Sequence, residues 1–267
     1  MPNYLVQSHL SIIKYAPMIF LLSIIFFLLL GWLYGRYRIR TSKDVIVRDS
    51  LATAIFGLSA LVLGFTFSSA NDHFNQRINT ASLEAASIER VYKSTKYLRP
   101  ADQALVQKSL REILHTRLTT YEHVEVIDDL NRNLDVLATQ LDNVNEEILS
   151  SIQKAPSANR DLAEKVLGTQ LEELIGSFHA GLLHSKSHPP AIIDQFLLVL
   201  LCVGALLSGY AMAVQKEEDW FLTILYVGLM GFALFVIFSL EFPNQLSSYD
   251  ALNSELLKVQ ERIRFIN

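Results

Sequence analysis

The sequence is poor in cysteine and in charged residues. Cys202 is the only cysteine among 267 residues, which excludes a disulfide framework and a cysteine-based metal site. Charged residues make up only 19% of the chain, against 51% hydrophobic residues, and the mean hydropathy is +0.27. This balance is too apolar for an ordinary soluble domain. The scarcity of charge therefore indicates a protein that is partly embedded in lipid.

Motifs of common enzyme classes are also missing. The sequence contains no G-x-G-x-x-G, Walker or nucleophile-elbow motif. His184 and His188 are four residues apart, with His179 nearby, so they could share a helix face and hold a metal. However, Pro189 follows at once and the segment has no carboxylate. We interpret it as a solvated loop and expect no catalytic residue, no metal site and no cofactor, so the chain is not predicted to be an enzyme.

The charge pattern argues against a nucleic-acid partner. The net charge is −4, from 23 basic and 27 acidic residues, and the basic residues are scattered instead of forming one stripe. Pairs of carboxylates at 128–129, 146–147 and 172–173 lie beside apolar helical stripes. Such pairs are typical of solvated helix faces, so no binding surface is predicted from them.

Four long apolar runs account for the high hydropathy. They cover residues 16–34, 51–69, 192–214 and 221–240, each near the roughly 20 residues that a helix needs to cross a bilayer. The first run is too long for the core of a signal peptide, and Arg36 follows it where a cleavage site would be expected. We therefore expect an integral membrane protein with four transmembrane helices, all of them retained.

A long polar insert separates the second and third runs. Apolar residues recur in it at alternating spacings of three and four, a heptad pattern typical of coiled coils and helical bundles. Pro156 breaks this pattern, and a second stripe follows, which predicts a helical hairpin. The first stripe comprises Ile127, Leu130, Leu134, Leu137, Leu141, Val144 and Ile148, and the second comprises Leu162, Val166, Leu167, Leu171, Leu174 and Ile175.

These patterns predict an all-α membrane protein with a large helical extramembrane domain inserted between the second and third spans. The expected segments follow from the apolar runs. They are an N-terminal tail (1–15), spans one and two (16–70), the helical domain (71–191), spans three and four (192–240) and a C-terminal amphipathic helix (241–267).

The second apolar run is unusually rich in small residues. Ala60, Gly64 and Ser68 are four apart, a spacing that lets membrane helices approach closely. Gly57, Leu61 and Phe65 form a neighbouring line. Small packing residues beside a few bulky apolar ones suit a pore-lining helix in an oligomer, where apolar rings gate by dewetting. The alternative is that Leu61 and Phe65 face lipid or a neighbouring helix. No proline occurs from 51 to 98, so one helix could run from the bilayer into water.

Two sequence segments in this region resemble a known family. The stretch GLSALVLGFTFSSANDHFNQR (57–77) resembles the second transmembrane helix of bestrophins, and SLEAASIERVYKSTKYLRP (82–100) resembles the bacterial bestrophin-like family, formerly described as a domain of unknown function. The resemblance implies a pentameric anion channel, such as a chloride channel, with a neck of Gly57, Leu61 and Phe65. It also implies a polar pore entrance near Asp72, His73 and Arg77.

The resemblance has limits within the motif itself. Gly57 stands where the family has a bulky neck residue, and His73 replaces a more usual basic residue. The calcium-binding acidic cluster of animal bestrophins is not recognisable after the last span, because Glu241, Asp250 and Glu255 are widely spaced. We therefore expect no calcium site.

The predicted function is passive ion conduction through a homo-oligomer in the lipid bilayer, expected to be the bacterial inner membrane. The partners are then permeant ions and further copies of the chain. A non-conducting membrane sensor or scaffold that signals through its helical domain remains the alternative. Orientation also stays open, because Arg36, Arg38 and Arg40 favour a cytoplasmic loop between the first two spans, whereas the resemblance implies a cytosolic helical domain.

Overall fold

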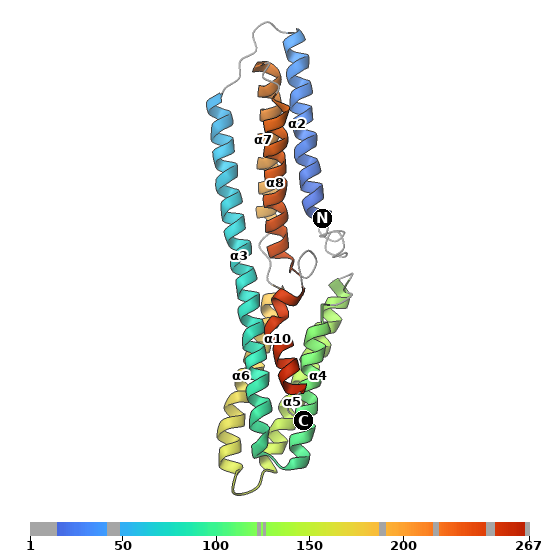
Figure 1. Ribbon diagram of the computed structural model, residues 1–267, viewed down its shortest axis with the longest axis vertical. Helices are drawn as coiled ribbons and strands as arrows, with labels where there is room; N and C mark the ends of the chain where they lie inside the picture. The colour runs from blue at the N-terminus through green and yellow to red at the C-terminus, as the bar shows by residue number, and fades with distance from the viewer. Residues whose placement is uncertain are drawn as a thin grey trace. The chain divides into compact units, whose positions relative to one another are not determined.

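The computed structural model describes residues 15–41, 49–121, 124, 127–186, 191–215, 219–243 and 249–264. Within these ranges every regular element is a helix (Figure 1). The predicted N-terminal tail, except Tyr15, and His188 lie outside the described residues. The helices are α2 (Ala16–Thr41), α3 (Asp49–Ser94), the short 3-10 helix η2 (Thr95–Tyr97), α4 (Pro100–Thr119), α5 (Ile127–Gln153), α6 (Arg160–Lys186), α7 (Ala191–Gln215), α8 (Trp220–Glu241) and α10 (Tyr249–Arg264).

Four helices are long and apolar enough to cross a membrane. They cover Ala16–Thr41, Ala52–Tyr97, Ile192–Gln215 and Trp220–Glu241, so each of the four predicted spans falls on a helix that could cross a membrane. The second is a single uninterrupted helix, as the lack of proline predicts. Its apolar first half and polar second half belong to different compact units of the chain, which divide between Phe74 and Asn75.

The first unit, here called the membrane unit, consists of residues 12–74 and 188–247. Its core joins α2, α7 and α8 through Ile24, Leu28, Leu197, Leu201, Ala205 and Leu234, with Val62 and Leu63 of α3 packed against it.

Glycine allows the closest contact in the membrane unit. A Cβ atom at Gly31 of α2 would overlap the carbonyl oxygen of Leu206, and one at Gly209 of α7 would overlap the carbonyl oxygen of Leu28. The backbones of α2 and α7 can therefore touch only because both residues lack a side chain. Sequence reasoning missed this contact, although Gly31 and Gly35 have the same four-residue spacing that it used in the second run.

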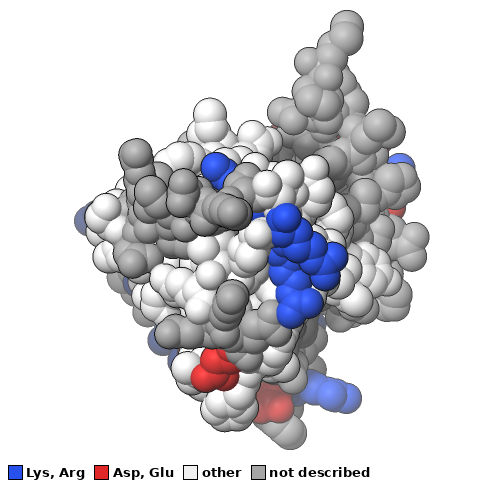
Figure 2. All heavy atoms as spheres, turned by 90° about the horizontal axis from the view of Figure 1, so that it is seen from above, with Lys and Arg blue, Asp and Glu red and all other residues white. Residues whose placement is uncertain are grey.

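Aromatic and basic residues mark one end of the membrane unit. Trp32 of α2 and Trp220 of α8 meet edge to face, with ring centroids 5.7 Å apart, and the Arg36 guanidinium lies 4.4 Å from the Trp32 ring centroid. Lys and Arg side chains gather on this end of the molecule (Figure 2). Tryptophan and arginine are the residues that favour a membrane–water interface, so this end is expected to lie at one bilayer surface.

The second unit, here called the helical unit, lies within residues 75–187 and 248–267. Its core contains Leu137, Leu141, Val144 and Ile148 of the predicted first stripe, and Leu134 is also buried. In the second stripe Leu167, Leu171 and Leu174 are buried, whereas Leu162 is 45% exposed and Ala163 is fully buried in its place.

The two stripes lie on separate helices that pack together. The chain turns between α5 and α6 over residues 154–159, so the predicted break at Pro156 is where the helices separate. The C-terminal helix α10 packs on α4 and buries Leu252, Leu256, Val259 and Ile263. Arg262 of α10 also donates a 2.8 Å hydrogen bond to Glu89 of α3.

Candidate functional site: the exposed face of α3 and an adjacent cavity

The membrane half of α3 has two chemically distinct faces. One face packs toward the other helices of the membrane unit, and on it Ser59, Thr66 and Ala70 are buried. Ser59 and Thr66 donate their hydroxyl hydrogens to the carbonyl oxygens of Ile55 and Val62, at 2.7 and 2.9 Å. Because these hydroxyls are satisfied within their own helix, they can be buried among apolar neighbours at little cost.

Five of the six residues singled out from the sequence lie on the other face, and Phe65 lies at its edge, where it also lines a cavity with residues of α7 and α8. Gly57, Ala60, Leu61, Gly64, Phe65 and Ser68 are all exposed, and positions three, four and seven apart share one side of a helix. The two predicted lines therefore form one continuous face, here called the outer face of α3. Leu61 and Phe65 are 54% and 67% exposed.

Both glycines of the outer face lie away from the rest of the described chain. A Cβ atom at Gly57 or Gly64 would meet nothing within 4 Å. This is the opposite of Gly31 and Gly209, which the α2–α7 contact requires. Within the described part of the chain, intrachain packing therefore does not explain either glycine of the outer face.

The predicted entrance residues differ in exposure. Asp72 is exposed, whereas His73 and Arg77 are half-buried. The Nδ1 atom of His73 lies 3.8 Å from Oε1 of Glu241 at the end of α8. His73 thus belongs to the same end of the membrane unit as the last turn of α8, an association that the sequence analysis did not predict.

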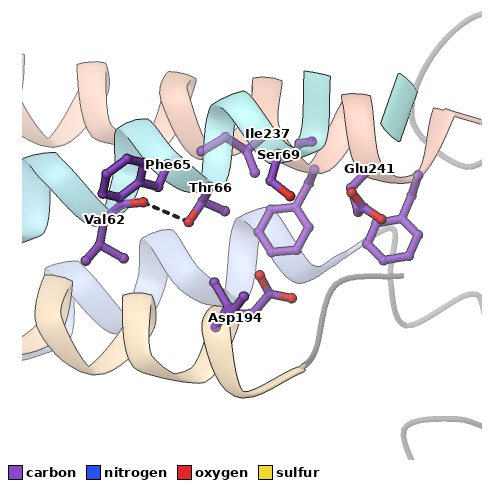
Figure 3. Close-up of a pocket in the computed structure, with 11 residues that line it drawn as sticks. Val62, Phe65, Thr66, Ser69, Asp194, Ile237 and Glu241 are labelled. Atoms are coloured by element: carbon purple, nitrogen blue, oxygen red, sulfur yellow. Dashed lines mark hydrogen bonds between the residues drawn. The ribbon is translucent and has the colours of Figure 1, made fainter. Parts of the chain in front are cut away.

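A cavity of about 310 Å³ lies beside the His73–Glu241 pair, between α3, α7 and α8 (Figure 3). Phe65 and Val62 lie toward one end, Glu241 lies at the other, and Asp194 extends from α7 between them. Its walls are mainly apolar. The lining residues are Val62, Phe65, Thr66, Ser69, Ala70, Ile193, Asp194, Ile237, Phe238, Glu241 and Phe242.

The positions of two carboxylates in the sequence are a signal for part of this cavity. Asp194 stands near the start of the third apolar run and Glu241 directly follows the fourth. Consecutive spans alternate in direction, so the start of one and the end of the next lie at the same end of the membrane unit. The two carboxylates could therefore have been predicted as neighbours.

No metal site is assembled elsewhere in the described chain. Its described residues contain no group of three or more His, Cys, Asp or Glu side chains placed to hold a metal ion. His179 is exposed on α6, and Cys202 is a free, buried thiol in α7.

Comparison with known proteins adds evidence about the fold. Two crystal structures of a bacterial bestrophin homologue from Klebsiella pneumoniae, a variant and one phased with zinc, each superpose with a TM-score of 0.66 at 14% identity. Both comparisons cover 92% of this chain and 97% or 96% of the homologue. A structure described as a membrane protein variant gives 0.66 at 16% identity, over 90% and 97% of the two chains.

The chain has the fold of bacterial bestrophin homologues. The resemblance predicted from residues 57–100 is thereby confirmed at the level of fold. No family model and no curated protein matches the sequence. This likeness shows the fold alone, so the function of the outer face of α3 must be argued from this chain's own residues.

Proposed function

We propose that this protein is an oligomeric, passive ion channel in which Gly57, Leu61 and Phe65 of α3 line the pore, while Ala60, Gly64 and Ser68 of the same helix pack against a neighbouring copy. The observation that carries the proposal is the exposure of the outer face of α3 within a single chain. Ala60, Gly64 and Ser68 form a line of small, exposed residues on it, which allows close approach of identical helices.

Two bulky residues on the same face supply a constriction. Leu61 and Phe65 are one helical turn apart, and both are more than half exposed. Around a symmetry axis each would form an apolar ring, and such rings control conduction by excluding water from a narrow pore. Gly57, one turn before Leu61, would leave a wider ring on that side. Asp72, His73 and Arg77 would provide polar groups where the pore meets water.

The fold supports the finer details of the proposal by analogy. The resemblance to bestrophin channels makes a monovalent anion such as chloride the first permeant ion to test and a pentamer the first stoichiometry. Residues 71–191, with the C-terminal helix, would form the extramembrane part, and the bacterial inner membrane is the proposed location.

The experiment is to reconstitute purified protein into planar bilayers and record currents in asymmetric potassium chloride. A channel gives discrete single-channel steps, and a reversal potential near the chloride equilibrium value identifies an anion pore. A reversal potential near the potassium value would keep the channel and reject anion selectivity. Absence of current from protein with its native oligomeric mass would favour the non-conducting sensor or scaffold.

A further inference from the structure

The cavity between α3, α7 and α8 has a chemistry that the channel proposal does not use. Its volume of about 310 Å³ falls at the lower end of the range for small-molecule sites, which are typically apolar with a few polar groups that orient the ligand. We propose that it binds a compact neutral molecule with an apolar body and one hydroxyl group. The body would lie against the apolar wall, and the hydroxyl would donate a hydrogen bond to Asp194.

The wall of the cavity determines the body of the ligand. Most of the lining residues are aliphatic or aromatic, and the aromatic surface comes from Phe65, Phe238 and Phe242. The rings of Phe238 and Phe242 stack with centroids 6.5 Å apart. Water is held poorly by an apolar wall, so a ligand that buries an apolar ring there would displace it favourably.

Asp194 provides the polar contact. It extends from α7 between Phe65 and Val62 at one end of the cavity and Glu241 at the other (Figure 3). A carboxylate accepts hydrogen bonds at several positions, so Asp194 can accept one from a ligand whatever its other contacts. Thr66 also lines the cavity, but its hydroxyl already donates to the carbonyl oxygen of Val62 at 2.9 Å. The ligand should therefore supply the donor.

A neutral ligand fits this cavity better than a charged one. Burying an ammonium or carboxylate group among apolar side chains costs far more than burying a hydroxyl, and a ligand anion would also be repelled by the carboxylate of Asp194. Glu241 does not decide the charge of the ligand, because it has partners of its own, among them His73 at 3.8 Å. A single hydroxyl needs only one acceptor, which Asp194 supplies.

The probe is 2-phenylethanol, and its methyl ether is the matched comparison, because the ether keeps the ring and the oxygen but has no donor. Equilibrium dialysis of the radiolabelled alcohol against purified protein in a non-ionic detergent should show saturable binding above the uptake by protein-free micelles. The ether should compete about tenfold or more weakly, as expected for loss of a hydrogen bond to a charged group. The 2-phenylethylammonium ion should also compete more weakly than the alcohol.

Substitutions assign the binding to this cavity. S69L fills part of it and leaves Asp194 in place, and D194A removes the acceptor, so each should weaken binding about tenfold or more. D194N keeps an acceptor oxygen and should bind the alcohol more tightly than D194A. The control is D142A, which removes an exposed carboxylate of α5 and should bind as wild type does. Melting temperatures near the wild-type value show that the variants are folded.

Several results would overturn the proposal. They are no saturable binding to wild type, equal competition by the ether, tighter competition by the ammonium ion, and wild-type affinity in S69L or D194A. The comparisons between ligands use the wild-type protein, so they test the proposal even where a variant is destabilised. None of these results depends on conduction.

Discussion

At the scale of single residues, a buried ion pair ties three helices of the helical unit together. Arg117 of α4 donates from Nε to Oε2 of Glu84 on α3 at 2.8 Å, and the two side chains are 9% and 1% exposed. Gly181 of α6 lies against the same carboxylate, because a Cβ atom there would overlap Oε1 of Glu84. A charge at this depth is tolerated because its partner is fixed beside it.

Removing one partner of this pair should therefore be costly. We expect E84Q to lower the free energy of unfolding by about 3–5 kcal/mol, the range for leaving a buried charge unpaired, and G181A to be destabilising because its methyl group would displace the carboxylate. Chemical denaturation followed by circular dichroism measures both. The control is E89Q, which removes a carboxylate paired with Lys93 and Arg262 nearer the surface and should cost less than about 1 kcal/mol. Equal effects in E84Q and E89Q would show that burial of the pair does not matter.

At the scale of elements, the apolar half of α3 has one buried face and one exposed face. The helix α5 buries one stripe along its length. In α3 the exposed face holds the small residues, although a span surrounded only by lipid has no reason to select them. In α5 the apolar residues outside the stripe are exposed. Val136 and Leu149 are each 47% exposed, whereas Leu134 and Leu141 in the stripe are 3% and 2% exposed.

The outer face of α3 should be sensitive to bulk. G64L places a large side chain where the single chain has open space, so it should leave the monomer folded and disrupt close packing between copies. Native mass spectrometry in detergent should show a lower oligomeric mass than wild type. The matched control is G228L, because Gly228 of α8 also has nothing near its Cβ position and lies outside the proposed contact. If G64L keeps the wild-type mass, the outer face contacts lipid.

The buried stripe of α5 should determine the stability of the helical unit. Replacing both Leu134 and Leu141 with Asp would bury two unpaired charges and remove two side chains worth about 1.5–3 kcal/mol each. The helical unit should then lose its cooperative thermal transition in circular dichroism. The double variant V136D/L149D, which changes two half-exposed positions of the same helix, should keep the transition. A similar loss in both variants would mean that general charge, not burial, is responsible.

At the scale of the whole molecule, strong periodic patterns could be predicted from the sequence and specific contacts could not. The four spans and the helices on either side of Pro156 follow from run length and heptad spacing. The predicted apolar stripe was wrong at Leu162, because the first turn of α6 buries Ala163 instead. Such stripes are weakest at helix ends. The Glu84–Arg117 pair joins residues 33 positions apart, and no local pattern marks such a pair.

The candidate site divides in the same way. The outer face of α3 could be predicted because its residues repeat along one helix. Of the cavity, only the nearness of Asp194 and Glu241 could be predicted, because the rest of its wall combines side chains from three helices whose contacts depend on tertiary packing. The exposure of Gly57, Leu61 and Phe65 is compatible with a pore wall, and their position in that wall is the central claim of the proposal.

Single-channel recording of L61A and F65A tests this claim most directly. Each substitution should widen an apolar ring, so we predict a larger unit current or a higher open probability than wild type. The control is L229A, since Leu229 of α8 is also exposed, at 62%, but lies outside the proposed pore, and its currents should match wild type. Wild-type unit current and open probability in both L61A and F65A would contradict the account by removing these residues from the pore wall.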